Sequence, residues 1–363
     1  MANDYYMMWL TGIKGMTVKK AYLLLSYFGK PEEIWNSDKM LLCSINGISE
    51  NFAERIIESR DPDVLDEKIN RLEELGIKYI SINNPDYPEL LRHIDEPPLG
   101  LYYKGTLPKK DDMCFSIIGS RLCSEYGSLV SQRFAKELVQ NGFTIVSGMA
   151  RGIDSMSHRG AINGGGKTIA VLGCGLDICY PPENQKLMAK IEENGCLISE
   201  YPPGTQPYPG NFPPRNRIIA GLSMGLLVVE ASKRSGTLIT VNHALDYGRD
   251  VFAVPANITS DLSAGTNELI KDGCPPVTCV EDILFELGVI KNVKEEKIEQ
   301  AAAEELTEEE QEILSCIKYE PVSLDDLIIL LDKPSQSIQY ILTYLEIYGY
   351  IKRLPGQRFV RAY

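Results

Sequence analysis

The chain has 363 residues, of which 44% are hydrophobic and 24% charged, the composition of a globular protein that can build a core. Its formal net charge of −13 argues against an anionic partner for the surface as a whole, although a cleft lined with cations can hold its own local field. No apolar run approaches the ~20 residues of a membrane span, and the N-terminus "MANDYYMMWLTGIKG" is a poor signal peptide, so we expect a cytoplasmic protein without membrane contact.

The length predicts two or three domains, and the first, residues 1–75, is predicted to be a helical domain of helix-hairpin-helix (SAM-like) type. Two similar pieces, "LTGIKGMTVKKAYLLLSYFG" and "LLCSINGISENFAERIIES", each carry a Gly-Ile pair, a short turn and an amphipathic helix. The N–H groups of such a turn can meet a phosphate. The second piece has Ser49 where a glycine is usual, so a packing role and a DNA contact both stay open.

The second domain, residues 76–288, begins with a bridge rich in turn signals, and from Cys114 short apolar runs alternate with amphipathic stretches. The expected strands are "CFSIIGS", "FTIVSGM", "TIAVLGCG", "CLISEY", "GLLVVEAS", "DVFAVPA" and "PVTCV". The expected helices are Ser124–Asn141, Pro182–Asn194, Arg217–Leu222, Thr237–Tyr247 and Thr266–Lys271. This alternation predicts an α/β fold with a parallel sheet covered on both faces, as in doubly wound proteins.

A third part follows a polar, charged linker predicted over residues 289–305. Residues 306–363 hold three helical patterns and then "YIKRLPGQRFVRAY", which indicates two strands around a Pro-Gly turn. Three helices with such a hairpin predict a winged helix. The presumed recognition helix, "PSQSIQYILTYLEIYG", contains no arginine or lysine, which favours a protein contact over reading of a DNA groove.

Two glycine-rich motifs in the core do not fit nucleotide binding. In "GGGKT", Ala161 stands where the first P-loop glycine is required, and the lysine leads into a strand instead of a helix. In "GCGLDICYPP", Ile178 stands where a dinucleotide fingerprint needs its third glycine. We interpret both as turns.

The histidines and cysteines do not form a catalytic or metal set. Asp154 and His158 have the i, i+4 spacing that would let them touch, and Asp154 fits a helix N-cap, so we expect them to brace this turn. No G-x-S-x-G supplies a nucleophile. The nine cysteines are scattered without a C-x-x-C, so we expect reduced thiols and no metal.

Arginines recur where the expected strands end, in "IIGSR", "VSGMARGID", "FPPRNR" and "EASKRSGT". In a doubly wound sheet these loops gather along one crevice, where glycines and helix N-termini favour anions. The cations that would gather there are Arg121, Arg151, Arg215, Arg217, Lys233 and Arg234. Several anion-friendly loops suit a string of phosphates, with Phe212 offering a face to a base, although pairing of some arginines with Asp154, Glu200 or Glu230 stays open.

Seven ordered stretches, "IIGSR…SEYG", "IVSGMARGIDSMSHRGA", "TIAVLGCGLDICYPPEN", "LISEYPPG", "NFPPRNRIIAGLS", "LLVVEASKRSGTLIT" and "VFAVP", resemble the DNA processing protein A (Smf) family over about residues 76–280. The flanking domains also fit its longer members. The resemblance implies an extended Rossmann fold that binds and protects incoming single-stranded DNA, forms a homodimer and loads the RecA recombinase during natural transformation. It implies no catalytic step and no cofactor.

The resemblance also assigns nucleic-acid binding to four groups of residues. They are Gly119, Ser120 and Arg121 in a first phosphate-binding turn; Ser147, Gly148, Ala150, Arg151 and Gly152 in a second; Phe212, Arg215, Asn216 and Arg217; and Ser235, Gly236 and Thr237. The chain departs from the pattern at Pro209, where some members have a lysine, and at Ala256-Asn257, where a glycine is usual.

The alternative is a nucleotide-binding Rossmann enzyme of the phosphoribohydrolase type, whose motif G-G-x-G-T-x-x-E needs an acid three residues after Thr237. Thr240 occupies that position, and a hydroxyl cannot replace a carboxylate at neutral pH. The sequence therefore favours a single-stranded DNA-binding mediator over an enzyme.

Overall fold

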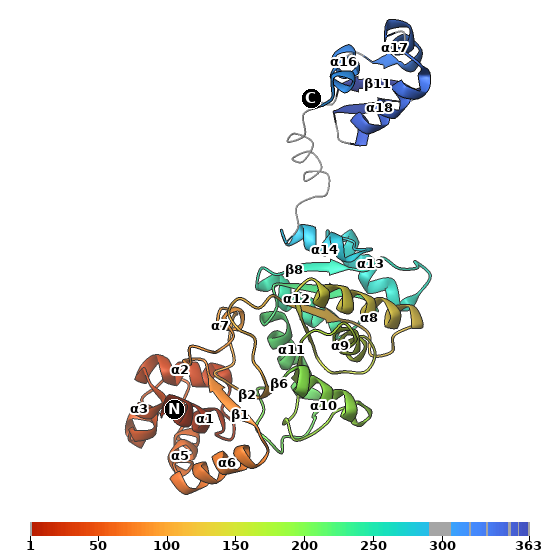
Figure 1. Ribbon diagram of the computed structural model, residues 1–363. Helices are drawn as coiled ribbons and strands as arrows, with labels where there is room; N and C mark the ends of the chain where they lie inside the picture. Colours follow the sequence, from red (N-terminus) through yellow and green to blue (C-terminus); the bar gives the residue numbers. More distant parts are fainter. Residues whose placement is uncertain are drawn as a thin grey trace. The chain divides into compact units, whose positions relative to one another are not determined.

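A computed structural model of the chain (Figure 1) describes residues 2–289, 306–318, 321–331, 333–347, 350–354 and 356–361. The chain divides into two compact units, Met1–Ile283 and Leu284–Tyr363. The linker predicted over residues 289–305 lies outside the described residues except for Val289. The predicted boundaries of the four segments stay predictions.

The first unit carries one large sheet and most of the helices. Its strands are β1 (Lys78–Ser81), β2 (Gly100–Gly105), β3 (Cys114–Ile118), β4 (Thr144–Ser147), β5 (Thr168–Leu172), β6 (Gly195–Ser199), β7 (Gly225–Val228) and β8 (Asp250–Ala253). The helices up to residue 286 are α1 (Ala2–Thr11), α2 (Val18–Phe28), α3 (Pro31–Asn36), α4 (Lys39–Cys43), α5 (Glu50–Glu58), α6 (Pro62–Glu74), α7 (Glu89–Arg92), α8 (Glu125–Gln140), α9 (Ile153–Asn163), α10 (Gln185–Asn194), α11 (Phe212–Gly221), α12 (Thr237–Asp246), α13 (Ala264–Lys271) and α14 (Val280–Glu286).

The eight strands follow the order β1-β2-β6-β5-β4-β3-β7-β8. Strands β3 to β8 pair in parallel, whereas β1 and β2 add an antiparallel edge next to β6. The order confirms the predicted Rossmann-like doubly wound sheet, because the chain runs outward from β3 to β6 and then returns to β7 on the other side of β3. The reversal creates a switch point between the carboxyl ends of β3 and β7, where such sheets bind ligands.

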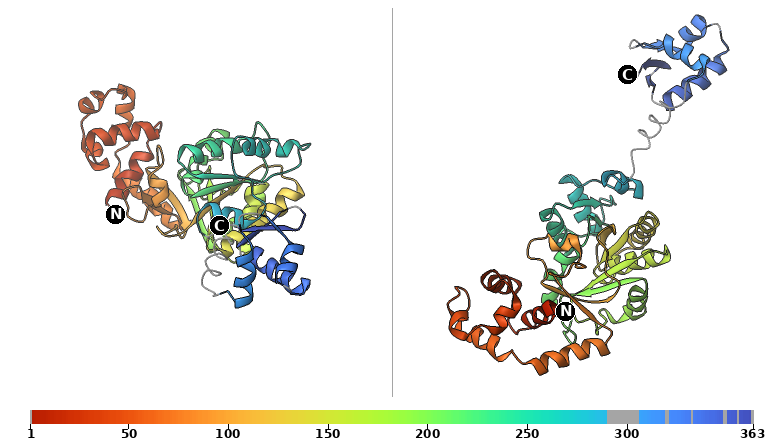
Figure 2. Two further views of the ribbon diagram at one scale, coloured as in Figure 1. Left: turned by 90° about the horizontal axis from the view of Figure 1, so that it is seen from above. Right: turned by 60° about the vertical axis from the view of Figure 1, so that its left-hand side comes forward.

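Helices cover both faces of this sheet, and the strands run between the two layers (Figure 2). The crossovers through α8, α9 and α10 step in one direction along the sheet, so right-handed connections place them on the same face. The crossovers through α11 and α12 step the other way and lie on the opposite face. There Ser116 of β3 donates a hydrogen bond to the carbonyl of Ile219 in α11 at 3.0 Å.

Two predicted elements differ from the structure. The stretch "PVTCV" does not form a strand: Pro276 makes one isolated bridge to Ala253, and α14 begins at Val280. Helix α11 begins at Phe212, five residues before the predicted start at Arg217, because prolines fit the first turn of a helix, where no intrahelical N–H is required.

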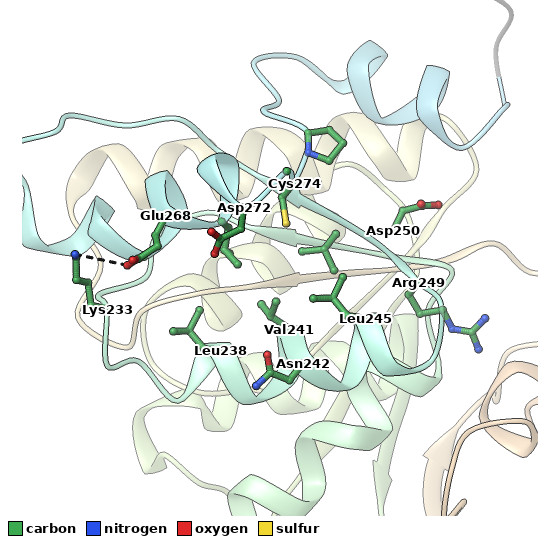
Figure 3. Close-up of a pocket in the computed structure, with 15 residues that line it drawn as sticks. Lys233, Leu238, Val241, Asn242, Leu245, Arg249, Asp250, Glu268, Asp272 and Cys274 are labelled. Carbon is green, nitrogen blue, oxygen red and sulfur yellow. Dashed lines mark ion pairs between the residues drawn. The ribbon is translucent and has the colours of Figure 1, made fainter.

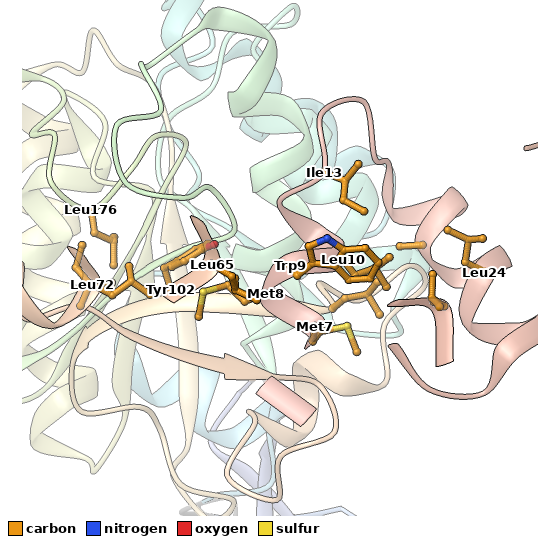
Figure 4. Packing of buried hydrophobic residues seen from close by; sticks show 14 of the residues in the cluster. Met7, Met8, Trp9, Leu10, Ile13, Leu24, Leu65, Leu72, Tyr102 and Leu176 are labelled. Carbon is orange, nitrogen blue, oxygen red and sulfur yellow. The ribbon is translucent and has the colours of Figure 1, made fainter. Parts of the chain in front are cut away.

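The predicted helix-hairpin-helix domain is confirmed and shares a hydrophobic cluster with the sheet (Figure 4). Trp9 of α1 packs edge-on against Trp35 with a centroid distance of 4.9 Å, and its Nε1 donates to the carbonyl of Ser59 at 3.0 Å. Leu72 of α6 and Tyr102 of β2 belong to the same cluster. This continuous packing explains why the helical domain and the sheet fall within one compact unit.

The second unit contains the predicted winged helix. Its elements are α16 (Glu308–Cys316), β9 (Val322–Ser323), α17 (Leu324–Leu331), α18 (Ser335–Ile347), β10 (Ile351–Leu354) and β11 (Arg358–Arg361). The wing strands pair antiparallel, and β11 also pairs with β9. Ile338, Leu342 and Leu345 of α18 are buried in a core of their own.

Among the residues that the structure describes, no helix is both long and apolar enough to span a bilayer.

Candidate nucleic-acid interface

A cleft of about 480 Å³ lies at the switch point, where loops that follow β3, β4 and β7 meet the start of α11. The structure brings most of the sequence-predicted site residues into its lining. Those that line it are Gly119, Ser120, Arg121, Ala150, Phe212, Arg215, Asn216, Ser235, Gly236 and Thr237. Ser147, Gly148, Arg151 and Gly152 belong to the turn beside it, and Arg217 lies one helical position further along α11.

The turn after β3 is shaped by a close approach of backbones. The N–H of Ser120 donates to the carbonyl of Glu230 at 2.7 Å, which ties the end of β3 to the residues after β7. A Cβ at Gly119 would meet that same carbonyl oxygen at 2.9 Å and the side chain of Ile153. Only glycine therefore fits here, and the turn leaves Arg121 exposed at its tip.

The turn after β4, Ser147–Gly152, packs against the first turn. Gly152 has φ +71°, and a Cβ there would overlap the carbonyl oxygen of Ser120. Ser147 Oγ donates to the carbonyl of Ile117 at 2.7 Å, so its hydroxyl holds two strand ends together. The N-cap of α9 is Gly152, and the prediction of Asp154 as N-cap is wrong, because the tight approach to Ser120 starts the helix earlier.

Asp154 and Arg215, which line the cleft, and His158 form a set of buried polar groups, here called the floor. Arg215 is 3% exposed; its Nη1 donates to the carbonyls of Gly148, at 2.7 Å, and Val171. Burial lowers the pKa of Arg215 to about 10, with Asp154 opposing the shift. Burial likewise raises the pKa of Asp154, which Arg215 opposes. Both charged groups are almost fully buried, so we assign them a structural role.

His158 completes the floor as a neutral side chain. Its Nδ1 lies 2.6 Å from Oγ1 of Thr168, which itself donates to the carbonyl of Ile145 at 2.8 Å, so Nδ1 carries the proton. Nε2 is buried without a hydrogen-bond partner in the described part of the chain. Burial lowers the pKa of His158 to about 3. His158 therefore links α9 to β5 and β4 through Thr168, whereas the i, i+4 spacing had suggested a contact with Asp154 that braces the turn.

Above the floor, Arg121, Arg151 and Phe212 form the outer edge of the site, here called the rim. The guanidinium of Arg121 lies 5.6 Å from the ring centroid of Phe212, and that of Arg215 lies at the same distance. A Cβ at Gly173 would meet Cδ1 of Phe212 at 2.9 Å, so this glycine makes room for the ring. Within the described residues, Arg121 has no carboxylate in salt-bridge range.

Arg151 is exposed but paired. Its Nε donates to Oε1 of Glu183 and its Nη2 donates to Oε2 at 3.1 Å, a two-point contact. The hydrogen bonds raise the pKa of Arg151 and lower the pKa of Glu183. A phosphate at Arg151 must therefore compete with this carboxylate, a feature that the sequence pattern did not reveal.

Three other predicted cations do not reach the cleft as free charges. Arg217 is 8% exposed, and its Nη2 donates to Oε1 of Glu200 at 2.7 Å, one of the pairings that the sequence left open. Lys233 pairs with Glu268 at 3.6 Å. Arg234 is exposed but does not line the cleft.

The loop after β7 brings the start of α12 into the cleft. Ser235 Oγ accepts from the N–H of Thr237 at 3.2 Å and donates to its Oγ1 at 2.8 Å, which orders the Ser-Gly-Thr turn. The first turn of α12 contains no acidic residue, and its N–H groups at Thr237, Leu238 and Ile239 donate within the turn, to Ser235 and Gly236. Thr240 is buried in the cleft lining, at the position where an enzyme of the alternative class would need an acid.

Some cleft residues escaped the sequence analysis. Leu122 is 80% exposed and Ile239 is 38% exposed, and both line the cleft as apolar surface beside the cations. Pro209, which replaces a lysine of some family members, also lines it. Ala256 is held in place by Asn267, which bonds to its N–H at 3.3 Å and to its carbonyl at 3.0 Å.

A second cavity of about 610 Å³ lies between α12, α13 and β8 (Figure 3). Leu238, Val241 and Leu245 form its apolar side, and the ion pair of Lys233 with Glu268 closes one end. Of the cations predicted to gather at the strand ends, Lys233 lines this cavity, whereas none of the four residue groups assigned to nucleic-acid binding does so among the residues that the structure describes. The larger cavity is thus separate from the switch-point cleft, since the two share no lining residue.

The described residues contain no group of three or more His, Cys, Asp or Glu side chains placed to hold a metal ion.

The geometry can be set beside known proteins. The family model for DNA recombination-mediator protein A matches residues 78–288, that for the DprA winged helix domain matches residues 297–357, and that for a SAM-like helix-hairpin-helix tandem matches residues 9–60. Protein Smf of Synechocystis sp. is 33% identical, over 99% of this chain and 100% of its own. DNA processing protein DprA of Streptococcus pneumoniae is 45% identical, over 57% of this chain and 73% of its own.

Two solved structures are similar as well. The crystal structure of DNA processing protein A from Streptococcus pneumoniae aligns with a TM-score of 0.68 and 36% identity, covering 77% of this chain and 96% of that one. The protein of the same name from Helicobacter pylori, solved for its single-stranded DNA binding mode, aligns with a TM-score of 0.51 and 30% identity, covering 58% of this chain and 95% of that one.

Proposed function

We propose, because the chain belongs to the DNA recombination-mediator protein A family, that it binds single-stranded DNA in the cleft at the switch point and acts as a mediator of recombination without catalysis. The observation that carries the proposal is the rim. An exposed guanidinium, Arg121, lies 5.6 Å from the ring of Phe212, so cation and aromatic surface face the same cleft. Phosphates and unstacked bases need these two surfaces side by side.

In this proposal the four groups of residues divide the contacts. Arg121 and Arg151 bind phosphates, and the glycine-lined turns at Gly119, Ser120 and Ser147–Gly152 let backbone N–H groups approach them. Ser235, Gly236 and Thr237 offer the start of α12 to another phosphate. Phe212 stacks on a base, and Asn216 lines the cleft beside it. Arg215 and Arg217 act by positioning, because their guanidiniums are buried.

The alternative, a nucleotide-processing enzyme, receives little support from the residues in the cleft. The carboxylate that lines it, Asp154, is buried and faces Arg215, so it is held as a structural charge. Thr240 offers a hydroxyl where that class needs a general acid or base. Absence of turnover with ATP, nucleoside monophosphates and nicotinamide cofactors is the expected result, and product formation that is lost in Arg151→Ala would favour the enzyme.

The more specific roles that the resemblance implies are proposals as well. We propose that the protein protects incoming single strands, loads a RecA-type recombinase on them, works as a homodimer during natural transformation and acts in the cytoplasm. The family membership and the relatives named for DNA processing support these roles. Pull-down of the recombinase and sedimentation of the pure chain test the two assemblies separately.

A salt-titrated binding assay tests the central proposal. Fluorescence anisotropy compares a labelled oligo-thymidine with a duplex of the same length. The single strand is expected to bind more tightly than the duplex. Each phosphate contact is expected to add about −0.7 to the slope of log affinity against log salt concentration. Equal affinity for both, or no dependence on salt, contradicts the proposal.

A further inference from the structure

The segment "YPPEN", between β5 and α10, takes no part in the binding scheme above, yet it contacts two parts of the site, the turn after β4 and Phe212. Glu183 pairs with Arg151 of the second turn. Asn184 contacts the same turn from below, and Tyr180 contacts the ring of Phe212. Three residues of one short segment therefore touch both the phosphate-binding turn and the aromatic part of the rim.

Asn184 fastens this segment to the site. Its side chain is 3% exposed, and Nδ2 donates to the carbonyl of Met149 at 3.1 Å and to Oγ of Ser155 at 2.8 Å. The carbonyl of Met149 belongs to the turn after β4, and the hydroxyl of Ser155 belongs to the first turn of α9. The segment cannot shift relative to the turn without breaking these two buried hydrogen bonds, so Tyr180 is held at a fixed place on the rim.

The ring of Tyr180 extends the aromatic surface of Phe212. The two centroids lie 5.5 Å apart with an angle of 38° between the ring planes. A base cannot enter between rings this close, since it needs about 7 Å between them when stacking distances are about 3.5 Å on each side. The pair therefore presents one continuous surface, on which neighbouring bases can stack from outside.

Exposure distinguishes Tyr180 from a packing residue. It is 37% exposed, whereas Phe212 is partly covered and has two guanidiniums near its ring, from Arg121 and Arg215. Part of the Phe212 surface is thus already occupied by cations. Tyr180 supplies the accessible aromatic surface next to them, and Pro181 stiffens the chain directly after it.

We propose, on the basis of the function proposed above, that Tyr180 is a second base-stacking residue and that the segment Tyr180–Asn184 forms a further wall of the single-stranded DNA site. The bases that follow the one on Phe212 stack on Tyr180. The contact reads no sequence, since every base has a π-face.

The test uses the full chain, Tyr180→Ala, Tyr180→Phe and a matched control, Tyr27→Ala, whose ring is 56% exposed on α2. Loss of one base stack corresponds to about a fivefold to hundredfold weaker oligo-thymidine binding in Tyr180→Ala. Tyr180→Phe and Tyr27→Ala are expected to bind within about twofold of the parent. The salt slope stays unchanged, because the ring contacts no phosphate.

An oligonucleotide with abasic sites gives the second readout. The parent chain is expected to bind this oligonucleotide more weakly than oligo-thymidine, because bases are missing. Tyr180→Ala and the parent are expected to bind the abasic oligonucleotide equally. Tyr180→Ala that binds oligo-thymidine as tightly as the parent overturns the stacking role and leaves the proposed function standing. A parent chain that binds no single-stranded DNA overturns both, and circular dichroism of the variants shows that each is folded.

Discussion

The floor and the rim of the cleft each contain arginine, but in opposite environments. Arg215 of the floor and Arg121 of the rim both have their guanidinium 5.6 Å from the centroid of Phe212. Arg215 is 3% exposed and donates to two backbone carbonyls, whereas Arg121 is exposed without a carboxylate partner among the described residues. Burial decides which arginine stabilises the fold and which is free to bind.

The largest effect is expected on stability, from the floor. Arg215→Ala leaves the carbonyls of Gly148 and Val171 without this donor and removes a positive charge that lowers the pKa of the buried Asp154, which is expected to lower the free energy of unfolding by about 3–5 kcal/mol. Urea denaturation measures this loss. The double variant Asp154→Asn, Arg215→Gln removes both charges and is expected to recover part of it. An Arg215→Ala protein as stable as the parent that no longer binds DNA would move Arg215 from the floor to the rim.

The pH dependence of stability tests His158. Burial lowers its folded-state pKa to about 3, below the ordinary 6.5, so between these values the unfolded chain binds the extra proton. The free energy of unfolding therefore contains a contribution that is complete above about pH 6.5 and is lost as the pH falls, by up to about 1.4 kcal/mol per unit. Denaturation of the parent and of His158→Gln at several pH values measures it, and a variant with an undiminished slope would exclude His158 as its source.

On the rim, Arg121→Ala is expected to weaken single-stranded DNA binding about tenfold and to reduce the log–log salt slope by about 0.7, because one phosphate contact is lost. Stability is expected to change by less than about 0.5 kcal/mol, as for other exposed positions. Arg159→Ala, an exposed arginine of α9 outside the cleft lining, serves as the control and is expected to bind like the parent. Equal losses in both variants would indicate an effect of net charge alone.

A smaller change in DNA affinity, and in the direction of tighter binding, is expected from substitution of Glu183. The carboxylate holds Arg151 in a two-point contact, so Glu183→Gln frees the guanidinium for a phosphate. Affinity for single-stranded DNA is expected to rise about two- to fivefold, the range of an exposed ion pair. The gain is expected to vanish when Arg151→Ala is added, and a gain that survives in the double variant would assign it to the removal of a negative charge near the DNA.

The smallest effect on binding is expected from the winged helix, whose residues belong to neither the floor nor the rim. Helix α18 contains no lysine or arginine, and Tyr340 on its outer side is 74% exposed. Truncation near residue 300 is expected to leave the affinity for single-stranded DNA within a few-fold, while recombinase loading falls. A hundredfold loss of affinity in a folded, dimeric truncation would place the winged helix in the DNA-binding surface.

Much of the fold could be predicted from sequence, since buried parallel strands are continuous apolar runs and turns are marked by glycine and proline. The runs from "CFSIIGS" to "DVFAVPA" all became strands. The stretch "PVTCV" did not, because an apolar run alone does not show whether a neighbouring strand is available for full pairing. The start of α11 was placed too late, because two prolines suggest a break although they fit a first turn.

The site was predictable as far as the backbone defines it. Glycines at strand ends signal close approach, and the structure gathers most of these turns in one cleft. Side-chain partners were harder to predict, since they join segments far apart in the chain. Glu183 on Arg151, Glu268 on Lys233 and Thr168 on His158 carry no local signal. Tyr180 was missed for the same reason, as its position on the rim depends on a contact with α11.

Photocrosslinking tests the central claim, that single-stranded DNA lies in the switch-point cleft, most directly. An oligonucleotide with 5-iodouracil, irradiated in complex with the full chain, forms adducts with aromatic side chains that stack on the base. Mass spectrometry is predicted to locate the adducts on the peptide that contains Phe212, with Tyr180 as a second position. Adducts confined to the winged helix or to the N-terminal helices, with none in the cleft, would contradict the account.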